Sequence, residues 1–247
     1  MQTPAKKPFY LVGHRGLPEH YPENTLSGIL AAIAEGADAV EFDIQISKDA
    51  IPVVIHDDTL VRTTGISGEL AEYTFSLLER ISAHEPARLG QSHLPESIPS
   101  LASLVHELKK WPEVHAFAEI KNEIFKRQNR EKTLQSIATI LEPIKAHCSI
   151  ISFDYEILSL ARKRGFSIGW VLDAMTETTQ AAALALAPEF LIIEYGQIPS
   201  SGPWPGPWHW FVYDITHGPS AQRAIDQGIT YIESWDVRGL KEYFDAL

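Results

Sequence analysis

The sequence predicts a single (β/α)₈ barrel, also called a TIM barrel, of the α/β class. Eight short runs of apolar, β-branched or aromatic residues recur along the 247 residues, and patterns typical of helices lie between many of them. Strands that alternate with helices form right-handed βαβ units in a parallel sheet, and eight units in about 250 residues favour a closed barrel. An open, doubly wound sheet is the structural alternative.

The expected elements follow one another in a regular order. The strands are expected at 9–13, 39–44, 115–120, 149–153, 167–172, 190–193, 210–213 and 229–232. The helices are expected at 24–35, 101–110, 133–141, 154–163, 176–186, 220–227 and 237–247. One domain over residues 1–247 accounts for this pattern.

Two segments depart from this regular order. Residues 45–99 separate the second strand from the next long helix, which is too much chain for a βα loop. We expect a subdomain inserted over the barrel mouth, with an extra strand at 51–55 and a short helix near 75–81. Residues 199–207 hold four prolines and two glycines where a sixth helix would fall, so a loop is expected there.

Composition and charge limit the partners and the compartment. The 21 Lys and Arg residues against 32 Asp and Glu give a net charge of −11, which disfavours binding to nucleic acid or to an anionic membrane. The single cysteine, Cys148, excludes an internal disulfide and a cysteine zinc site. No apolar stretch is long enough to span a bilayer or to form a secretory leader, so we expect a cytoplasmic protein without stable membrane anchoring. Nothing in the sequence sets the oligomeric state.

The first strand runs directly into His14 and Arg15, with a glycine on either side. The carboxyl ends of barrel strands form the active face, so both side chains are candidates for a site. Pro22, Glu23, Asn24 and Thr25 follow. Asn24 is a candidate N-cap of the first helix, and capping is the expected role of Asn24 and Thr25.

Carboxylates lie near the ends of two further strands. The period of two along a strand places Glu41 and Asp43 on one face of the second strand, and Glu119 and Lys121 on one face of the third. Three carboxylates at one barrel mouth repel one another, so they are either partly protonated or bound to a cation. Oxygen ligands favour one Mg²⁺ or Ca²⁺ ion. For each pair alone, a solvated strand end is the alternative.

A second histidine, His56, follows the expected strand at 51–55. Two histidines at one mouth, His14 and His56, can divide the tasks of general acid and general base. Three carboxylates, a divalent cation, Arg15 and Lys121 sum to one positive charge, which suits a monoanion such as a phosphodiester. A metal-dependent lyase or aldolase barrel is one competitor, and a non-catalytic sensor of phosphate esters is another.

Seven motifs occur in an order and at spacings that resemble a known family. They are His14-Arg15-Gly16, Pro22-Glu23-Asn24-Thr25, Glu41-Phe42-Asp43, His56-Asp57-Asp58-Thr59-Leu60 with Arg62-Thr63-Thr64, Ile98-Pro99-Ser100-Leu101, Glu119-Ile120-Lys121 and Ser152-Phe153-Asp154. This set, spanning about residues 10–172, resembles the glycerophosphodiester phosphodiesterases, relatives of the phosphatidylinositol-specific phospholipases C. The family's fold is a (β/α)₈ barrel with a small insertion after the second strand.

The resemblance implies a role for each candidate residue. Glu41, Asp43 and Glu119 are expected to bind the metal, His14 and His56 to be the acid and base, and Arg15 and Lys121 to hold the phosphate. Glu23 is expected to orient Arg15 or His14. Family members cleave a small diester, such as glycerophosphocholine or glycerophosphoethanolamine, to an alcohol and sn-glycerol 3-phosphate. Attack by water and attack by the neighbouring glycerol hydroxyl are both open routes.

The resemblance weakens in the last third of the chain. The family's W-T-V-N appears as Trp210-Phe211-Val212-Tyr213, and its G-V-D-G-I-x-T-D appears as residues 228–235 with both Asp positions lost. The pocket for the alcohol therefore differs from the family's, and a different phosphodiester is an alternative substrate. The tryptophans 204, 208, 210 and 235 and Tyr231 gather in this part of the chain. Trp210, Tyr231 and Trp235 are candidates for an aromatic wall against the alcohol, with simple packing as the alternative.

Overall fold

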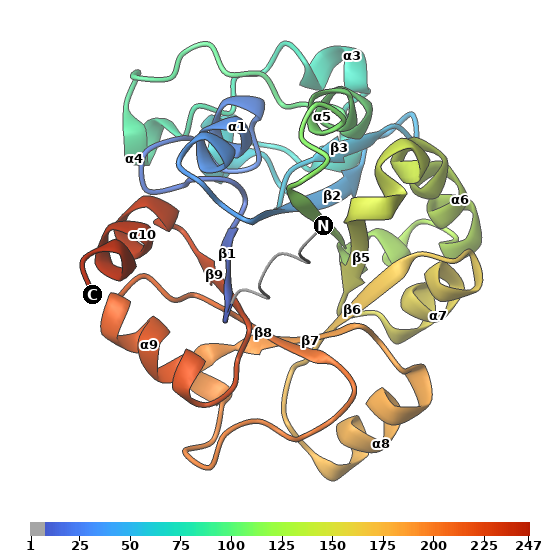
Figure 1. Cartoon of the computed structure of the whole chain (residues 1–247). Helices are drawn as coiled ribbons and strands as arrows, with labels where there is room; N and C mark the ends of the chain where they lie inside the picture. The colour runs from blue at the N-terminus through green and yellow to red at the C-terminus, as the bar shows by residue number, and fades with distance from the viewer. Residues whose placement is uncertain (1–7) are drawn as a thin grey trace.

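Eight parallel strands close into a barrel in the computed structural model, which describes residues 8–247 (Figure 1). They are β1 (Tyr10–Gly13), β2 (Ala39–Ile46), β4 (His115–Ile120), β5 (Cys148–Ser152), β6 (Ser167–Val171), β7 (Phe190–Glu194), β8 (His209–Tyr213) and β9 (Tyr231–Ser234). Each strand pairs with the next in this series, and β1 pairs with both β2 and β9, which closes the barrel. The predicted fold class is confirmed. The expectation that no leader precedes the domain concerns residues 1–7, which lie outside the described residues.

Helices surround the barrel and bury the outer faces of its strands. They are α1 (Leu26–Ala34), α5 (Leu101–Leu108), α6 (Arg130–Leu141), α7 (Tyr155–Lys163), α8 (Glu177–Leu186), α9 (Gly218–Asp226) and α10 (Val237–Asp245). Phe42 and Ile44 of β2 belong to the large core on this outer side. Within residues 8–247, no helix has both the length and the apolarity needed to cross a bilayer.

Aromatic side chains fill the inside of the barrel near its amino-terminal end. The ring of Phe117 lies 4.9 Å from those of Phe190 and Phe211, centroid to centroid. The ring of Tyr231 stacks 4.8 Å from that of Tyr10 at the same end. Because this end is packed, the described interior of the barrel can open to a ligand at the carboxyl ends of its strands.

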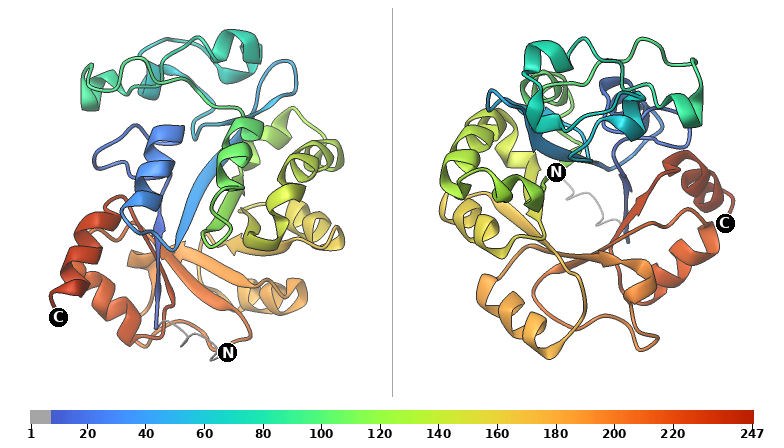
Figure 2. Two further views of the ribbon diagram at one scale, coloured as in Figure 1. Left: turned by 45° about the horizontal axis from the view of Figure 1, so that its top comes forward. Right: turned by 180° about the vertical axis from the view of Figure 1, so that it is seen from behind.

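The chain between β2 and α5 forms an insertion at the carboxyl end of the barrel (Figure 2). It contains β3 (Pro52–Val54), α2 (Val61–Thr64), η1 (Leu70–Glu72), α3 (Phe75–Leu78) and α4 (Pro86–Leu89). β3 pairs antiparallel with the end of β2, which extends the sheet beyond the barrel. Buried Val53, Leu60, Leu70 and Leu78 give the insertion a small core of its own.

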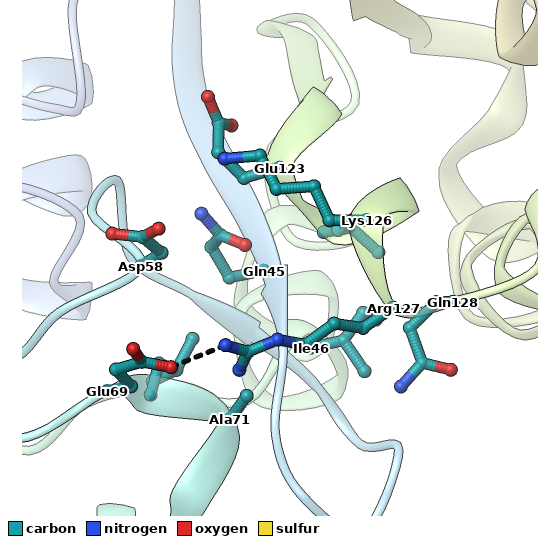
Figure 3. Close-up of a pocket in the computed structure, with 11 residues that line it drawn as sticks. Gln45, Ile46, Asp58, Glu69, Ala71, Glu123, Lys126, Arg127 and Gln128 are labelled. Atoms are coloured by element: carbon teal, nitrogen blue, oxygen red, sulfur yellow. Dashed lines mark hydrogen bonds and ion pairs between the residues drawn. The ribbon is translucent and has the colours of Figure 1, made fainter.

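The insertion also contacts the loop that follows β4. The 3₁₀ helix η2 (Asn122–Lys126) leads into Arg127, whose Nη2 lies 2.6 Å from Glu69 Oε2 of the insertion (Figure 3). The ion pair is exposed, so its contribution to stability is small, about 0–1 kcal/mol. It nevertheless joins the insertion to the barrel beside a small polar pocket.

Tryptophans take the place of a helix between β7 and β8. The structure describes only the 3₁₀ turn η4 (Tyr195–Gln197) and a proline-rich loop in this connection, as the sequence predicts. Trp210 Nε1 donates a hydrogen bond to the Trp204 carbonyl at 2.7 Å, and Trp208 and Trp210 are buried in the outer core. Packing is therefore the role of these tryptophans, and Trp210 faces away from the barrel interior.

Candidate active site

A cavity of about 210 Å³ lies at the carboxyl ends of the barrel strands. Six of the residues predicted for catalysis, phosphate binding and metal binding line it, namely His14, Arg15, Glu41, His56, Glu119 and Lys121. Asp43 lies directly beside them, because its carboxylate contacts both Arg15 and Lys121. The structure thus brings together side chains from β1, β2, β4 and the insertion.

The turn after β1 depends on its two glycines. A Cβ at Gly13 would lie 2.6 Å from the Gly16 carbonyl oxygen, and one at Gly16 would lie 2.6 Å from the backbone of α1. The turn continues through Arg15 at φ 54° and Gly16 at φ 95°. This geometry directs the Arg15 N–H to Glu41 Oε2, 3.0 Å away.

Three buried carboxylates converge at the mouth, as predicted from the strand periodicity. Glu41, Asp43 and Glu119 each offer an oxygen within 4.8 Å of the others. Burial, with Asp43 adding to it, raises the pKa of Glu41 well above its ordinary value. Burial acts to raise the pKa of Asp43 too, but Arg15 and Lys121 lower it below the ordinary value. Glu41 Oε1 is buried without a hydrogen-bond partner.

This donor set fits a divalent cation. Carboxylate oxygens are the ligands that Mg²⁺ and Ca²⁺ prefer, and an unpartnered buried oxygen on Glu41 is open to a metal ion. The acidic cluster therefore has the chemistry of the expected metal site.

Arg15 and Lys121 lie on either side of Asp43. Arg15 Nε is 3.1 Å from Asp43 Oδ2, and Lys121 Nζ is 3.4 Å from Asp43 Oδ1 and 2.9 Å from Glu119 Oε1. Both cations line the cavity, so they can contact an anion there.

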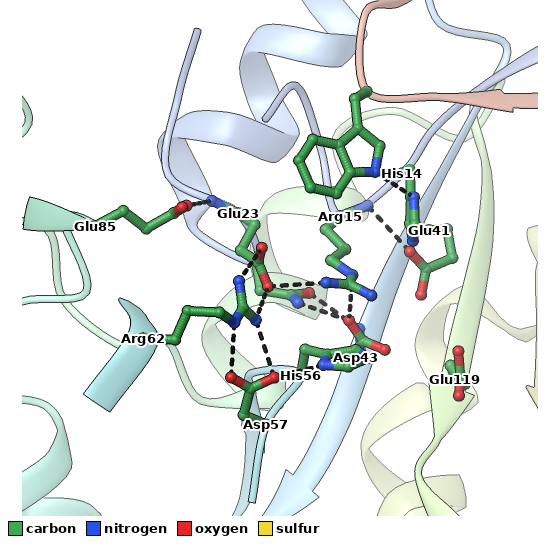
Figure 4. Close-up of polar contacts among 12 residues, drawn as sticks. His14, Arg15, Glu23, Glu41, Asp43, His56, Asp57, Arg62, Glu85 and Glu119 are labelled. Atoms are coloured by element: carbon green, nitrogen blue, oxygen red, sulfur yellow. Dashed lines mark hydrogen bonds and ion pairs between the residues drawn. The ribbon is translucent and has the colours of Figure 1, made fainter. Parts of the chain in front are cut away.

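A salt-bridge network behind Arg15 fixes its position (Figure 4). Glu23 Oε1 accepts a hydrogen bond from Arg15 Nη1 at 3.1 Å, and both Glu23 oxygens accept from Arg62 at 2.7 Å. Arg62 Nε in turn donates to Asp57 at 2.7 Å. Glu23 therefore contacts Arg15, as expected. Arg62, which links Glu23 to Asp57, was not predicted to take part in the site, although it belongs to one of the seven motifs.

The predicted capping role is confirmed for Thr25 and wrong for Asn24. Thr25 caps the helix, since its Oγ1 accepts from the Gly28 N–H at 3.1 Å. Asn24 instead adopts φ 55°, which asparagine tolerates better than most residues. Its Nδ2 donates to Asp43 Oδ2 at 2.7 Å, and its Oδ1 accepts from the Asp43 N–H at 3.0 Å. Asn24 thus orients Asp43.

The two histidines have different partners. His56 Nδ1 lies 2.6 Å from Asp57 Oδ1, so this carboxylate can hold a proton on Nδ1. His14 Nδ1 accepts from Trp235 Nε1 at 2.8 Å, and because an indole N–H only donates, the proton of neutral His14 is on Nε2. Burial, with Arg15 adding to it, lowers the pKa of His14 to about 3.

Of the three candidates for an aromatic wall, only Trp235 lines the cavity. Trp210 packs on the outer side of the barrel. Tyr231 points inward but lies at the start of β9, at the closed amino-terminal end. The prediction for these two residues is corrected, and Phe153 and Tyr213 supply aromatic rings at the cavity instead.

A fourth buried carboxylate, Glu233, was missed because β9 begins two residues later than predicted. Gly228 at φ 86° and the hydrogen bond from the Ile229 N–H to the Ala224 carbonyl end α9, so a turn at residues 227–228 and a short link at 229–230 precede the strand. Glycine just after a helix is the signal for such an end. The shift places Glu233 in β9 facing the cavity, where burial raises its pKa well above the ordinary value.

Comparison with known proteins agrees with this geometry. A family model described as "Glycerophosphoryl diester phosphodiesterase family" matches residues 14–188. The chain belongs to that family. Glycerophosphodiester phosphodiesterase 1 of Homo sapiens is 40% identical over 96 residues, which are 39% of this chain and 29% of that protein. A glycerophosphodiester phosphodiesterase of Bacillus altitudinis is 29% identical over 153 residues, covering 62% of this chain and 61% of the relative.

Solved structures of family members share the whole fold. A phosphodiesterase from Oleispira antarctica, in complex with the product sn-glycerol-3-phosphate, has a TM-score of 0.83 at 23% identity and covers 96% of both chains. A protein from Silicibacter pomeroyi described as a putative glycerophosphoryl diester phosphodiesterase also has a TM-score of 0.83, at 17% identity, covering 96% of this chain and 94% of that one.

Proposed function

We propose that this protein hydrolyses glycerophosphodiesters, such as glycerophosphocholine or glycerophosphoethanolamine, to an alcohol and sn-glycerol 3-phosphate. The observation that carries the proposal is the convergence of three carboxylates, two cations and two histidines on one cavity. Family membership supports the same reaction, and one structural neighbour holds the product sn-glycerol-3-phosphate. The substrate is a small diester rather than a nucleic acid.

We assign one divalent metal ion, Mg²⁺ or Ca²⁺, to Glu41, Asp43 and Glu119. Such an ion, when bound, stabilises negative charge on the phosphoryl oxygens as a Lewis acid. Arg15 and Lys121 hold the same phosphate by charge-assisted hydrogen bonds. Glu23, braced by Arg62, orients the Arg15 guanidinium, and Asn24 orients Asp43.

His14 and His56 carry out the proton transfers in this proposal. One takes a proton from the attacking oxygen, of water or of the glycerol hydroxyl, as the new bond to phosphorus forms. The other gives a proton to the alcohol oxygen as its bond to phosphorus breaks. Asp57 stabilises positive charge on His56, whereas the Trp235 N–H opposes a second proton on His14. His56 is therefore the histidine that begins the cycle protonated and gives its proton to the alcohol oxygen. Neutral His14 takes the proton of the attacking oxygen on Nδ1, in place of the Trp235 hydrogen bond, and releases it to solvent when the products leave.

The test measures release of sn-glycerol 3-phosphate from glycerophosphocholine with Mg²⁺, with Ca²⁺ and with chelator. We expect release that depends on metal and is lost in the His56→Ala variant. No release with either ion would refute the proposed activity.

The buried, unpaired Cys148 suits a reducing compartment, in line with a cytoplasmic location.

A further inference from the structure

Glu85 of the insertion holds the backbone of Glu23. The Glu23 N–H donates a hydrogen bond to Glu85 Oε1 at 2.6 Å, although the two residues are 62 positions apart in the chain (Figure 4). Glu85 stands immediately before α4, is 4% exposed and belongs to none of the seven motifs. A buried N–H needs an acceptor, which the backbone usually supplies. Here a carboxylate from a distant part of the chain supplies it.

Arg88 joins the same carboxylate to the loop between β1 and α1. Its Nε and Nη2 donate to Glu85 at 2.7 and 2.8 Å, so the buried carboxylate faces a positive charge. The Arg88 guanidinium also donates to the carbonyl of Tyr21 at 2.9 Å and to that of Pro18. Glu85 and Arg88 together therefore fasten the insertion to the loop that carries Glu23.

The backbone of Glu85 completes a ring of contacts around Glu23. The Glu85 N–H donates to the Thr63 carbonyl at 2.8 Å, and Thr63 directly follows Arg62. Arg62 in turn donates to both oxygens of the Glu23 carboxylate at 2.7 Å. The insertion thus fixes Glu23 twice, at its backbone through Glu85 and at its side chain through Arg62.

The backbone conformation of Glu85 is unfavourable for a glutamate. It has φ 50° and ψ 64°, in the left-handed region that residues other than glycine rarely adopt. Pro86 follows, and the residue before a proline favours an extended conformation. Glycine would form such a turn more easily. Strained residues persist where their surroundings fix them, and they gather at functional sites, so the strain indicates a use for the carboxylate itself.

The position of Glu23 bears directly on Arg15. Glu23 Oε1 accepts from Arg15 Nη1 at 3.1 Å, and Arg15 lines the cavity where the phosphate is expected. Because Arg62 limits rotation of the Glu23 carboxylate, a shift of the Glu23 backbone would carry this oxygen away from Arg15. A displacement of about 1 Å at a substrate-binding group can cost up to about 100-fold in rate.

We propose that Glu85 is a positioning residue that sets, through Glu23, the place of Arg15 beside the phosphate. This inference rests on the proposed diesterase activity, which assigns Arg15 to the phosphate. Simple attachment of the insertion to the barrel is the competing role for Glu85. Attachment alone predicts a loss of stability, whereas positioning predicts a loss of phosphate binding that depends on Arg15.

The experiment is a double-mutant cycle between Glu85→Ala and Arg15→Ala. Its readout is the Kd of sn-glycerol 3-phosphate, measured by calorimetry with the divalent ion that supports turnover at saturation. Lys121 and the metal ion still bind the phosphate in Arg15→Ala, so its affinity stays measurable.

Two further variants separate positioning from stability. Glu85→Gln keeps an oxygen that can accept from the Glu23 N–H. Leu78→Ala is the control for stability, because Leu78 is fully buried in the core of the insertion and its apolar side chain forms no hydrogen bond to Glu23. Denaturant unfolding establishes that each protein is folded under the conditions of the titration.

We expect Glu85→Ala to weaken product binding about tenfold when Arg15 is present and less than about twofold in Arg15→Ala, as for residues of one hydrogen-bond network. Glu85→Gln should recover most of the loss. Leu78→Ala should lose stability but bind product within about twofold of the wild type. In Glu85→Ala, kcat/KM should fall equally, about tenfold, for glycerophosphocholine and glycerophosphoethanolamine, because the two substrates share the phosphate.

Three results would overturn the inference. A tenfold loss in both backgrounds of the cycle means that Glu85 does not act through Arg15. Unchanged product affinity in Glu85→Ala leaves Glu85 only the attachment of the insertion. A loss of Mg²⁺ or Ca²⁺ affinity as large as the loss of product affinity places the effect at the metal site. Hydrolysis of none of the diesters by the wild type would refute the proposed function, whereas the cycle on product binding tests the positioning separately.

Discussion

Asn24 is the only described side chain that holds Asp43 by hydrogen bonds both to its carboxylate and to its backbone, at 2.7 and 3.0 Å. The substitution Asn24→Gly removes both bonds without backbone strain, because glycine accepts φ 55° readily. The buried Asp43 N–H then lacks its partner, which costs about 1–3 kcal/mol of folding free energy. Loss of such an orienting partner typically weakens metal binding about 10–100-fold.

The assay combines calorimetric titration of Mg²⁺ and Ca²⁺ with denaturant unfolding of the metal-free protein. Thr25→Ala is the matched control, because it removes the N-cap of α1 next to Asn24 and costs about 0.5–2 kcal/mol without a bond to Asp43. We expect both variants to lose stability but only Asn24→Gly to lose metal affinity. Metal binding by Asn24→Gly within twofold of the wild type, or an equal loss in Thr25→Ala, would refute the reasoning.

Four further results are expected. Excess chelator should abolish turnover, and full activity in chelator would contradict the metal assignment. Glu119→Gln should weaken metal binding while circular dichroism shows an intact fold. His14→Ala and His56→Ala should each lower kcat by about 10²–10⁴. A nitrophenyl diester, whose leaving group needs less help from an acid, should restore kcat only in the variant that lacks the general acid. Equal restoration in both variants would exclude separate roles for the two histidines. The pKa of His14 is lowered from 6.5 to about 3 by burial and by Arg15, so the unfolded chain binds a proton in this range that the folded chain does not. Stability should therefore fall with decreasing pH below 6.5 by up to about 1.4 kcal/mol per pH unit, and the slope should be shallower in His14→Gln; identical slopes would argue against a buried neutral His14. Trp210→Ala should cost about 3–5 kcal/mol of stability, since the ring is buried in the outer core, and should leave the preference among diesters unchanged.

The sequence by itself determined the barrel and most of the polar site. Strand periodicity is a local property, so alternate residues of β2 could be assigned to opposite faces: Phe42 and Ile44 to the outer core, Glu41 to the cavity. The carboxyl ends of parallel strands must meet at one mouth, which brings Glu119 and Lys121 to the same place. Length and the proline-rich segment likewise predicted the insertion and the missing helix.

Only the tertiary structure decided the contacts between residues far apart in the chain. Asn24 meets Asp43 nineteen residues away, and Trp235 meets His14 across 221 residues. No local pattern encodes such pairs, because they depend on how the strands close into a ring. The extent of β9 is a similar case. A shift of two residues keeps each side chain on its face but extends the strand to Glu233, whose carboxylate therefore lies at the open end of the barrel. Tyr231, two residues earlier on the same face, lies at the packed end because each strand residue advances about 3.3 Å along the strand.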